Sequence, residues 1–276
     1  MTHPNESIAI LLTGAIRNHV DKDFIFNVIS NIREQFAFIP TVHIYFGTWK
    51  QLEKPTDIFD KDYVNYDNEF YENIKNVVDY FFLFERPNDF SPEFNITRLA
   101  SPEESIKIYR MFSNITLLCD KLLESDMKYN YICRYRNDII LKADFPLCID
   151  NIRNGITDYE TTPTFWTFND CISDQFCIAK QDDFFKIWYN SKEDICRMFT
   201  EWNETPEKLV LIKVNKEHLK LRLFIPLFYN FKGRCFVDEG RVIIANTNGY
   251  MHRYLKDIFC RKYGCGYDDE RIATFI

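Results

Sequence analysis

The run from Tyr131 to Leu141 joins an apolar, β-prone stretch to charged residues at every second position. In one extended strand, the side chains of Arg134, Arg136 and Asp138 would project from the same face. Arginine offers a planar fork of donors that matches phosphate, and a nearby aspartate suits a divalent cation or a sugar hydroxyl. The spacing therefore indicates a site for a phosphate-bearing ligand, although an arginine–aspartate network at the edge of a core would show the same alternation.

These charges fall late in the run, where a buried parallel strand reaches its carboxyl end. In open α/β sheets, ligands bind in the crevice outside those ends. An earlier apolar strand, predicted at 8–12, runs into Thr13-Gly14-Ala15-Ile16-Arg17. Glycine lets a ligand approach the backbone closely, and Arg17 is placed to reach a phosphate. Glycines also occur in such turns merely as caps, so this turn alone is weak support for a site.

The surrounding elements are those of an α/β sheet. Strands are expected at 8–12, 41–46 and 77–84, with an amphipathic helix at about 20–36 between the first two. The second strand is expected to end in a turn, Gly47-Thr48-Trp49, whose tryptophan is more easily read as packing than as stacking on a base. Ser101-Pro102-Glu103-Glu104 begins a helix that continues to about Leu123 and leads into the strand at 131.

Beyond Leu141 the sequence is polar and turn-rich to about residue 162, and a short aromatic strand follows at 165–168. Helices are expected from Asp182 to about Phe199 and from Thr205-Pro206-Glu207 onward, with a strand at 221–229. Without a convincing linker or repeat, residues 1–276 are interpreted as one domain. Its nucleotide-binding half spans about 8–141 and its acceptor-side half about 142–276.

Composition excludes several classes of protein. Of the 276 residues, 46% are hydrophobic, which argues against disorder, and a net charge of −7 with no run of five basic residues argues against a nucleic-acid partner. No apolar run approaches the ~20 residues of a membrane helix, and the polar start shows no secretory signal. The nine scattered cysteines suggest a reduced, cytoplasmic protein, and Cys235, Cys260 and Cys265 lack the paired spacing of a zinc site.

The order of five short motifs resembles a known family. The motifs are Gly14-Ala15-Ile16-Arg17, Gly47-Thr48-Trp49, the run Tyr131–Asp138, Ser173-Asp174-Gln175-Phe176, and Thr205-Pro206-Glu207-Lys208-Leu209. Together they resemble nucleotide-sugar-dependent glycosyltransferases of the WavE lipopolysaccharide-synthesis type and their relatives in capsule loci and large DNA viruses. The resemblance spans most of residues 8–220. It implies a single GT-A-like (Rossmann-like) fold, with a mixed, mostly parallel sheet flanked by helices.

The resemblance also implies where the donor binds. The nucleotide-sugar would lie on the first strand-end turns and the central strand, against Thr13, Gly14, Arg17, Arg134, Arg136 and Asp138. GT-A enzymes usually hold Mn²⁺ or Mg²⁺ with an Asp-x-Asp motif, whereas this chain has Arg136-Asn137-Asp138, with one carboxylate. Two alternatives follow: Asp138 holds the metal, with His252 as a further candidate ligand, or Arg134 and Arg136 neutralise the diphosphate without metal.

Asp174 is the candidate general base, which would take the proton of an acceptor hydroxyl in an inverting transfer. Trp166 and Phe168 offer apolar faces on which an acceptor sugar can pack. An aspartate before a helix is more often an N-cap, and that alternative stays open here. Asp170 and Glu207 are alternative bases.

The leading hypothesis is therefore transfer of a hexosyl or pentosyl group from a nucleoside-diphosphate sugar to a glycan hydroxyl. A non-catalytic carbohydrate- or protein-binding module on the same fold is one rival, supported by the missing second carboxylate. A nucleotidyltransferase is another, although its first loop is usually richer in glycine. The sequence leaves the sugar, the nucleotide base, the acceptor and the stereochemical outcome open.

Overall fold

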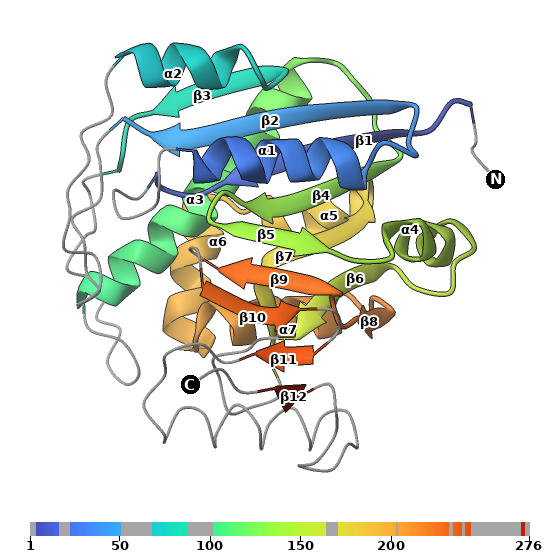
Figure 1. Ribbon diagram of the computed structural model, residues 1–276. Coiled ribbons are helices and arrows are strands. Elements are labelled where there is room, and N and C mark those ends of the chain that lie inside the picture. Colours follow the sequence, from blue (N-terminus) through green and yellow to red (C-terminus); the bar gives the residue numbers. More distant parts are fainter. Residues whose placement is uncertain are drawn as a thin grey trace.

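The computed structural model describes residues 4–16, 23–50, 68–87, 106–163, 171–198, 201–202 and 204–230, together with the backbone at 102–105, 199–200, 231, 234–238, 241–243 and 272–273. A seven-stranded sheet runs through its centre in the order β3-β2-β1-β4-β7-β6-β8 (Figure 1). Its strands are β1 (Ser7–Thr13), β2 (Thr41–Trp49), β3 (Tyr80–Phe84), β4 (Tyr131–Arg136), β6 (Tyr159–Pro163), β7 (Ile172–Lys180) and β8 (Leu221–Leu223).

The sheet is mixed and mostly parallel, as predicted. Strands β3, β2, β1 and β4 pair in parallel, and β8 pairs in parallel with β6. Strand β7 runs antiparallel to both of its neighbours, β4 and β6. The carboxyl ends of β1 and β4 lie in register, with Thr13 opposite Arg136. The amino end of β7 lies beside them because that strand runs the other way.

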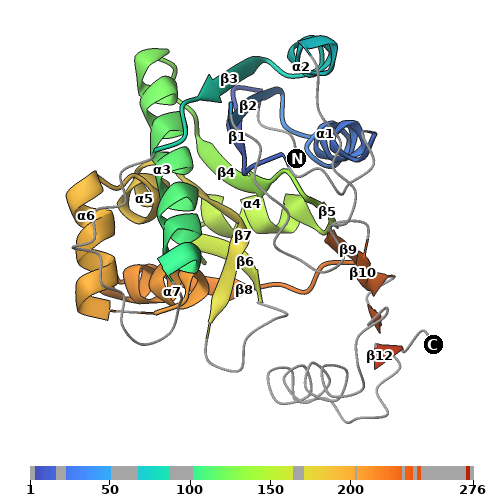
Figure 2. The same ribbon diagram turned by 90° about the vertical axis from the view of Figure 1, so that its left-hand side faces the viewer.

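Helices cover both faces of the sheet (Figure 2). Strand β1 is apolar throughout because Ile8, Ile10 and Leu12 belong to the core on one face, whereas Ala9 and Leu11 belong to the core on the other. The first core includes residues of α1 (Phe24–Gln35), α2 (Asn68–Lys75) and α4 (Phe145–Arg153). The second includes residues of α3 (Pro102–Glu124), α5 (Gln181–Trp188), α6 (Lys192–Arg197) and α7 (Pro206–Lys216).

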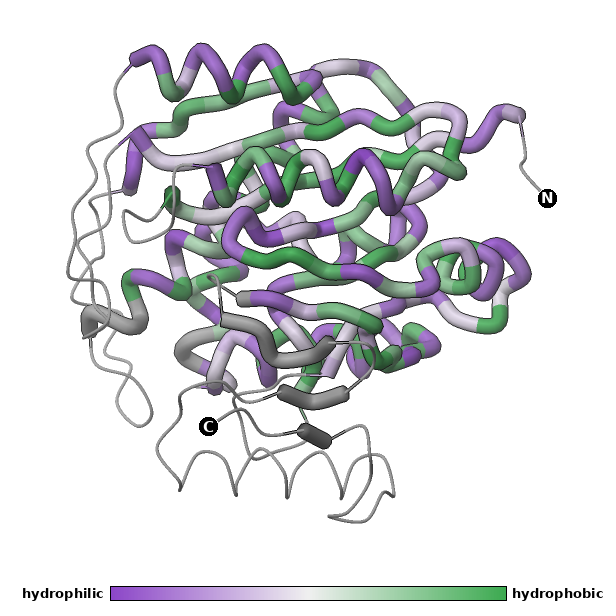
Figure 3. The backbone as a smooth tube through the Cα atoms, in the orientation of Figure 1, coloured by the Kyte–Doolittle hydropathy of each residue, from purple (hydrophilic) through white to green (hydrophobic). Residues whose placement is uncertain are grey.

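Local capping explains where several helices begin. The Thr205 hydroxyl accepts the Lys208 N–H, and proline occupies the first turn of α7, as the sequence indicated. Helix α3 likewise matches its prediction. Helix α2 alternates hydrophilic and hydrophobic residues, as a helix with one buried side should (Figure 3).

The predicted strand 131–141 is wrong as a single element. Strand β4 ends at Arg136, and a turn at Asn137 and Asp138 leads into β5 (Ile139–Lys142). Strand β5 belongs to a second sheet of order β12-β11-β10-β9-β5, which also contains β9 (Phe228–Phe231), β10 (Arg234–Asp238), β11 (Arg241–Ile243) and β12 (Ile272–Ala273). The alternation of side chains therefore holds for Arg134 and Arg136 but stops before Asp138.

Other predicted elements also differ. Gly47-Thr48-Trp49 continues β2 instead of forming a turn, and a Cβ atom on Gly47 would lie only 2.7 Å from Leu118 Cγ of α3. The helix expected from Asp182 to Phe199 is divided into α5, α6 and a π-helical turn (Met198–Trp202), because Ser191 starts a new helix with a capping box. Helix α4 and strand β6 fall in the stretch interpreted as turns. The predicted strand at 165–168 lies outside the described residues.

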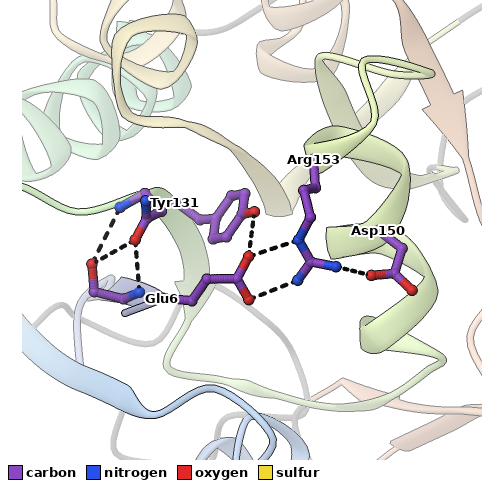
Figure 4. Close-up of polar contacts among 6 residues, drawn as sticks. Glu6, Tyr131, Asp150 and Arg153 are labelled. Carbon is purple, nitrogen blue, oxygen red and sulfur yellow. Dashed lines mark hydrogen bonds and ion pairs between the residues drawn. The ribbon is translucent and has the colours of Figure 1, made fainter. Parts of the chain in front are cut away.

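A partly buried ionic cluster ties the start of β1 to α4 (Figure 4). Both Glu6 carboxylate oxygens accept from Arg153, from Nε at 2.7 Å and Nη2 at 2.6 Å. The Tyr131 hydroxyl donates to Glu6 at 3.0 Å, and Asp150 pairs with Arg153 from within α4. The Glu6 side chain is 12% exposed, so this carboxylate depends on its partners for solvation.

Replacing Arg153 by methionine is expected to lower the free energy of unfolding by about 2–3 kcal/mol, because a largely buried carboxylate loses its bidentate partner. Urea denaturation measures this change. Arg197→Met is the matched control, since the Arg197–Asp194 pair is solvent-exposed and should contribute less than about 1 kcal/mol. Equal losses in the two variants would show that the Glu6 cluster has no special weight.

Candidate active site

A cavity of about 250 Å³ lies at the carboxyl ends of β1 and β4, on the face covered by α3. Strand β1 contributes Thr13 and is followed there by Gly14, and β4 contributes Arg134 and Arg136. The two arginines share a face because strand side chains alternate. This is the strand-end position at which ligands bind in open α/β sheets.

Two carboxylates line the same cavity from elements distant in sequence. Asp174 is the third residue of β7, and Glu207 lies in the first turn of α7. The alternative prediction, that Asp174 is the N-cap of the following helix, is wrong because Asp174 lies inside β7. The antiparallel direction of β7 brings its first residues next to the end of β4.

Arg134 is fully buried and has no hydrogen-bond partner within the described part of the chain. Its Nε, Nη1 and Nη2 atoms are all unpaired. The guanidinium carbon lies 4.2 Å from the centre of the Trp188 ring, so one face stacks on an indole. Burial lowers the pKa of Arg134, and the Asp174 carboxylate acts in the opposite direction. A buried cation with unused donors is costly, so this position is built for an anion.

Arg136 is paired, in contrast. Its Nε and Nη2 atoms donate to the two Asp138 carboxylate oxygens at 2.9 and 2.6 Å. Burial acts to lower the pKa of Arg136, but Asp138 and Asp174 outweigh it and hold that pKa above its ordinary value. Arg136 is therefore a fixed cation at the cavity wall.

Asp138 does not fit the role of metal ligand that the resemblance implied for it. The turn after β4 directs its carboxylate to Arg136, which occupies both oxygens, and Asp138 is not among the residues lining the cavity. Within the described ranges, no group of three or more His, Cys, Asp or Glu residues is arranged to hold a metal ion.

The Asp174 carboxylate acts on the carboxyl of Glu207. Burial, together with the charge of Asp174, raises the pKa of Glu207 to about 7. At pH 7 the Glu207 carboxyl is thus about half protonated. An acid with such a raised pKa in a cavity is typical of sites that bind or move protons.

Helix α3 supplies a wall that sequence reasoning missed. Lys107, Arg110 and Asn114 recur at the i, i+3, i+7 spacing of one helical face and line the cavity. This polar stripe, which lies next to the apolar stripe of the same helix, was the sequence signal that could have identified these three residues. Lys107, Arg110, Arg134 and Arg136 outnumber Asp174 and Glu207, four to two, so the cavity is cationic in a chain of net charge −7.

Several predicted site residues cannot be placed with the others. Arg17, Trp166, Phe168 and His252 lie outside the described residues, as does Asp170. Trp49 lines the cavity and is 3% exposed, with its ring 6.4 Å from that of Phe84. This packing agrees with the sequence-based interpretation that Trp49 packs against its neighbours.

No family model matches this chain, and no curated protein sequence matches it. Among solved structures, the galactosyltransferase LgtC with donor and acceptor sugar analogues is similar at 10% identity and a TM-score of 0.38, covering 75% of this chain and 70% of LgtC. A glycosyltransferase involved in the glycosylation of the major capsid of PBCV-1 gives 9% identity and a TM-score of 0.35, covering 86% of this chain and 84% of that one. The CTP complex of CMP:2-keto-3-deoxy-manno-octonic acid synthetase gives 9% and 0.36, covering 80% and 89%. At these values the likeness carries no functional inference.

In the helices that the structure describes, none is long and apolar enough to cross a membrane.

Proposed function

We propose that this protein is a glycosyltransferase that moves a hexosyl or pentosyl group from a nucleoside-diphosphate sugar to a carbohydrate hydroxyl. The observation that carries the proposal is the buried, unpaired guanidinium of Arg134, which lines a cationic strand-end cavity beside Arg136. Two fixed guanidiniums suit the two phosphates of such a donor. The carboxyls of Asp174 and Glu207 suit sugar hydroxyls and a proton transfer in the same cavity.

In this mechanism, an acceptor oxygen attacks the anomeric carbon, and the bond from that carbon to the diphosphate oxygen breaks. The bonding electrons leave with the diphosphate, where negative charge grows against Arg134 and Arg136. Charges already held in place stabilise that growth without reorganisation. Asp174 accepts the proton from the acceptor hydroxyl, which gives inversion when the attack comes from the face opposite the leaving group. Arg17 is proposed as a further phosphate contact, and Trp166 and Phe168 as the acceptor-side platform.

Of the two alternatives for the metal, we propose the one in which Arg134 and Arg136 take the place of Mn²⁺ or Mg²⁺. Both carboxylate oxygens of Asp138, the residue that the resemblance assigned to the ion, accept hydrogen bonds from Arg136, which supports this alternative. Asp138 acts instead as a positioning residue that holds Arg136 at the cavity wall.

A thermal-shift screen of UDP-, GDP-, CMP- and dTDP-sugars tests this proposal, with each donor measured in Mn²⁺ and in EDTA. We expect one nucleotide class to stabilise the protein by ~2.7 kcal/mol at a hundredfold excess over Kd. Stabilisation should persist in EDTA and be lost in Arg136→Ala. Release of nucleoside diphosphate in the presence of mixed glycan acceptors then measures transfer.

The other outcomes decide between the alternatives. Stabilisation by nucleoside triphosphates but not by any nucleotide-sugar would indicate a nucleotidyltransferase. Stabilisation by glycans alone would indicate a binding module. Stabilisation that disappears in EDTA would reject the metal-independent donor site.

A further inference from the structure

Asn114 is buried in the wall of the cavity with one half of its amide group unused. The residue is 2% exposed and lines the cavity from α3. Its Oδ1 atom accepts the Gly14 N–H at 3.4 Å, whereas its Nδ2 atom has no hydrogen-bond partner among the described residues. A buried amide donor without an acceptor is uncommon, and it calls for an explanation by a ligand or a water.

The orientation of this amide is fixed by its surroundings. If the amide were reversed, its NH₂ would face the Gly14 N–H, placing two donors against each other. Gly14 is itself held, because Asn137 Nδ2 donates to the Gly14 carbonyl at 2.9 Å and the Asn137 N–H donates to Thr13 at 3.0 Å. Gly14 has φ of +126°, and a Cβ atom there would lie 2.8 Å from Asn137 Oδ1. Only glycine suits this junction, which presents the N–H to Asn114.

A second neutral donor lies at the same edge of the cavity. The Thr13 hydroxyl is unpaired, and Thr13 is 2% exposed and pairs across the sheet with Arg136. Both neutral groups can donate, and the adjacent Arg134 offers only donors. A ligand that satisfies all three must be rich in acceptor oxygens. A phosphate group meets that need, whereas a sugar hydroxyl group brings its own proton.

We propose that Asn114 Nδ2 and the Thr13 hydroxyl bind phosphate oxygens of the donor, next to Arg134, and so form a neutral half of the diphosphate site. This inference rests on the proposed function and assigns two of its ligand contacts. Because the Gly14–Asn137 junction engages the Oδ1 atom of Asn114, the Nδ2 atom of Asn114 is left to face the ligand. The triplet Asn114-Ile115-Thr116 has the sequence of an N-glycosylation acceptor, but the Asn114 side chain is buried in the fold.

Asn114→Asp is a sharp test because it keeps the oxygen that accepts from Gly14 and changes only the unpaired NH₂. Isothermal titration with inorganic pyrophosphate, UDP and GDP measures the effect. We expect Asn114→Asp to weaken the binding of pyrophosphate, and of whichever nucleotide binds the wild type, by about a hundredfold, because an acceptor replaces a donor beside an anion. The loss should shrink at high salt, since charge repulsion is screened.

Thr13→Val provides a nearly isosteric second variant in case Asn114→Asp fails to fold, and it should weaken pyrophosphate binding about tenfold at all salt concentrations. If wild-type protein binds these probes and both folded variants bind them equally well, this inference is wrong while the proposed function stands. If the wild-type protein binds none of them and no nucleotide-sugar stabilises it in the thermal-shift screen, the proposed function itself fails.

Discussion

Arg134→Met is expected to raise the melting temperature of the ligand-free protein while removing most of its stabilisation by nucleotide-sugars. Arg134 is fully buried, and its three guanidinium nitrogens are unpaired. Replacing buried charged groups by apolar side chains of similar volume is often neutral or stabilising, by up to about 4 kcal/mol for whole ion pairs, and the Arg134 guanidinium has no hydrogen bond to lose within the described residues. Loss of stacking on Trp188 offsets part of that gain, so a net gain of about 1–2 kcal/mol is expected. Donor affinity should fall by roughly 30-fold or more.

Arg136→Met is the matched control, because the second arginine lines the same cavity but is already paired. Removing it takes the guanidinium from Asp138, whose side chain is 8% exposed, and should lower the free energy of unfolding by about 2–4 kcal/mol. Both variants should lose donor binding. Urea denaturation measures the opposite effects of the two variants on stability. Titration with the donor measures the loss of binding that the two variants share. If Arg134→Met destabilised the protein as much as Arg136→Met, the buried guanidinium would be a structural residue.

Asp174→Asn is expected to reduce kcat by about 10²–10⁴-fold, because the acceptor hydroxyl loses its general base. The effect on donor affinity should be small and favourable, since the substitution removes a negative charge near the diphosphate. Steady-state kinetics and donor titration of the same variant separate the two effects. A loss of donor affinity with unchanged kcat would assign Asp174 to binding and leave the base unidentified.

Glu207 should make donor binding depend on pH. Its pKa of about 7 means that it is protonated below neutrality and ionised above. As pH rises from 6 to 8, a second carboxylate becomes charged in the cavity, so the affinity for a nucleotide-sugar should fall. The diphosphate of that ligand is esterified at both ends and does not change its own charge in this range. Glu207→Gln should remove the pH dependence, and an unchanged profile would exclude Glu207 as its source.

Linkage gives an independent check on the same residue. The pKa of Glu207 in the folded protein lies above its ordinary value of 4.5. The contribution of the protonated Glu207 carboxyl to folding stability is therefore fully present below pH 4.5 and is lost as pH rises through about 7. The shift corresponds to about 3 kcal/mol. The stability of Glu207→Gln relative to wild type should therefore increase across this pH interval, as measured by urea denaturation at each pH.

Much of the fold could be predicted from the sequence because its signals are local. The apolar run of β1, the cap and proline at Thr205-Pro206, and the start of α3 each depend on residues within one or two turns. The missed α4 also carried a local signal, since Asp144 accepts the Leu147 N–H and Pro146 lies in the first turn. The division of the helix after Asp182 followed from the capping box at Ser191, which is equally local.

For the candidate site, local sequence was enough to predict that Arg134 and Arg136 share one face at the end of a central strand, because strand side chains alternate with a period of two. The other features of the site depend on how distant elements pack. The turn after β4 directs the Asp138 carboxylate toward Arg136 instead of toward a ligand. Pairing of β4 with β7, some 40 residues later in the sequence, brings Asp174 beside the two arginines. Helix packing placed Asn114 in the cavity wall and Trp188 beneath Arg134. These contacts join elements far apart in the chain, so no local pattern of residues could specify them.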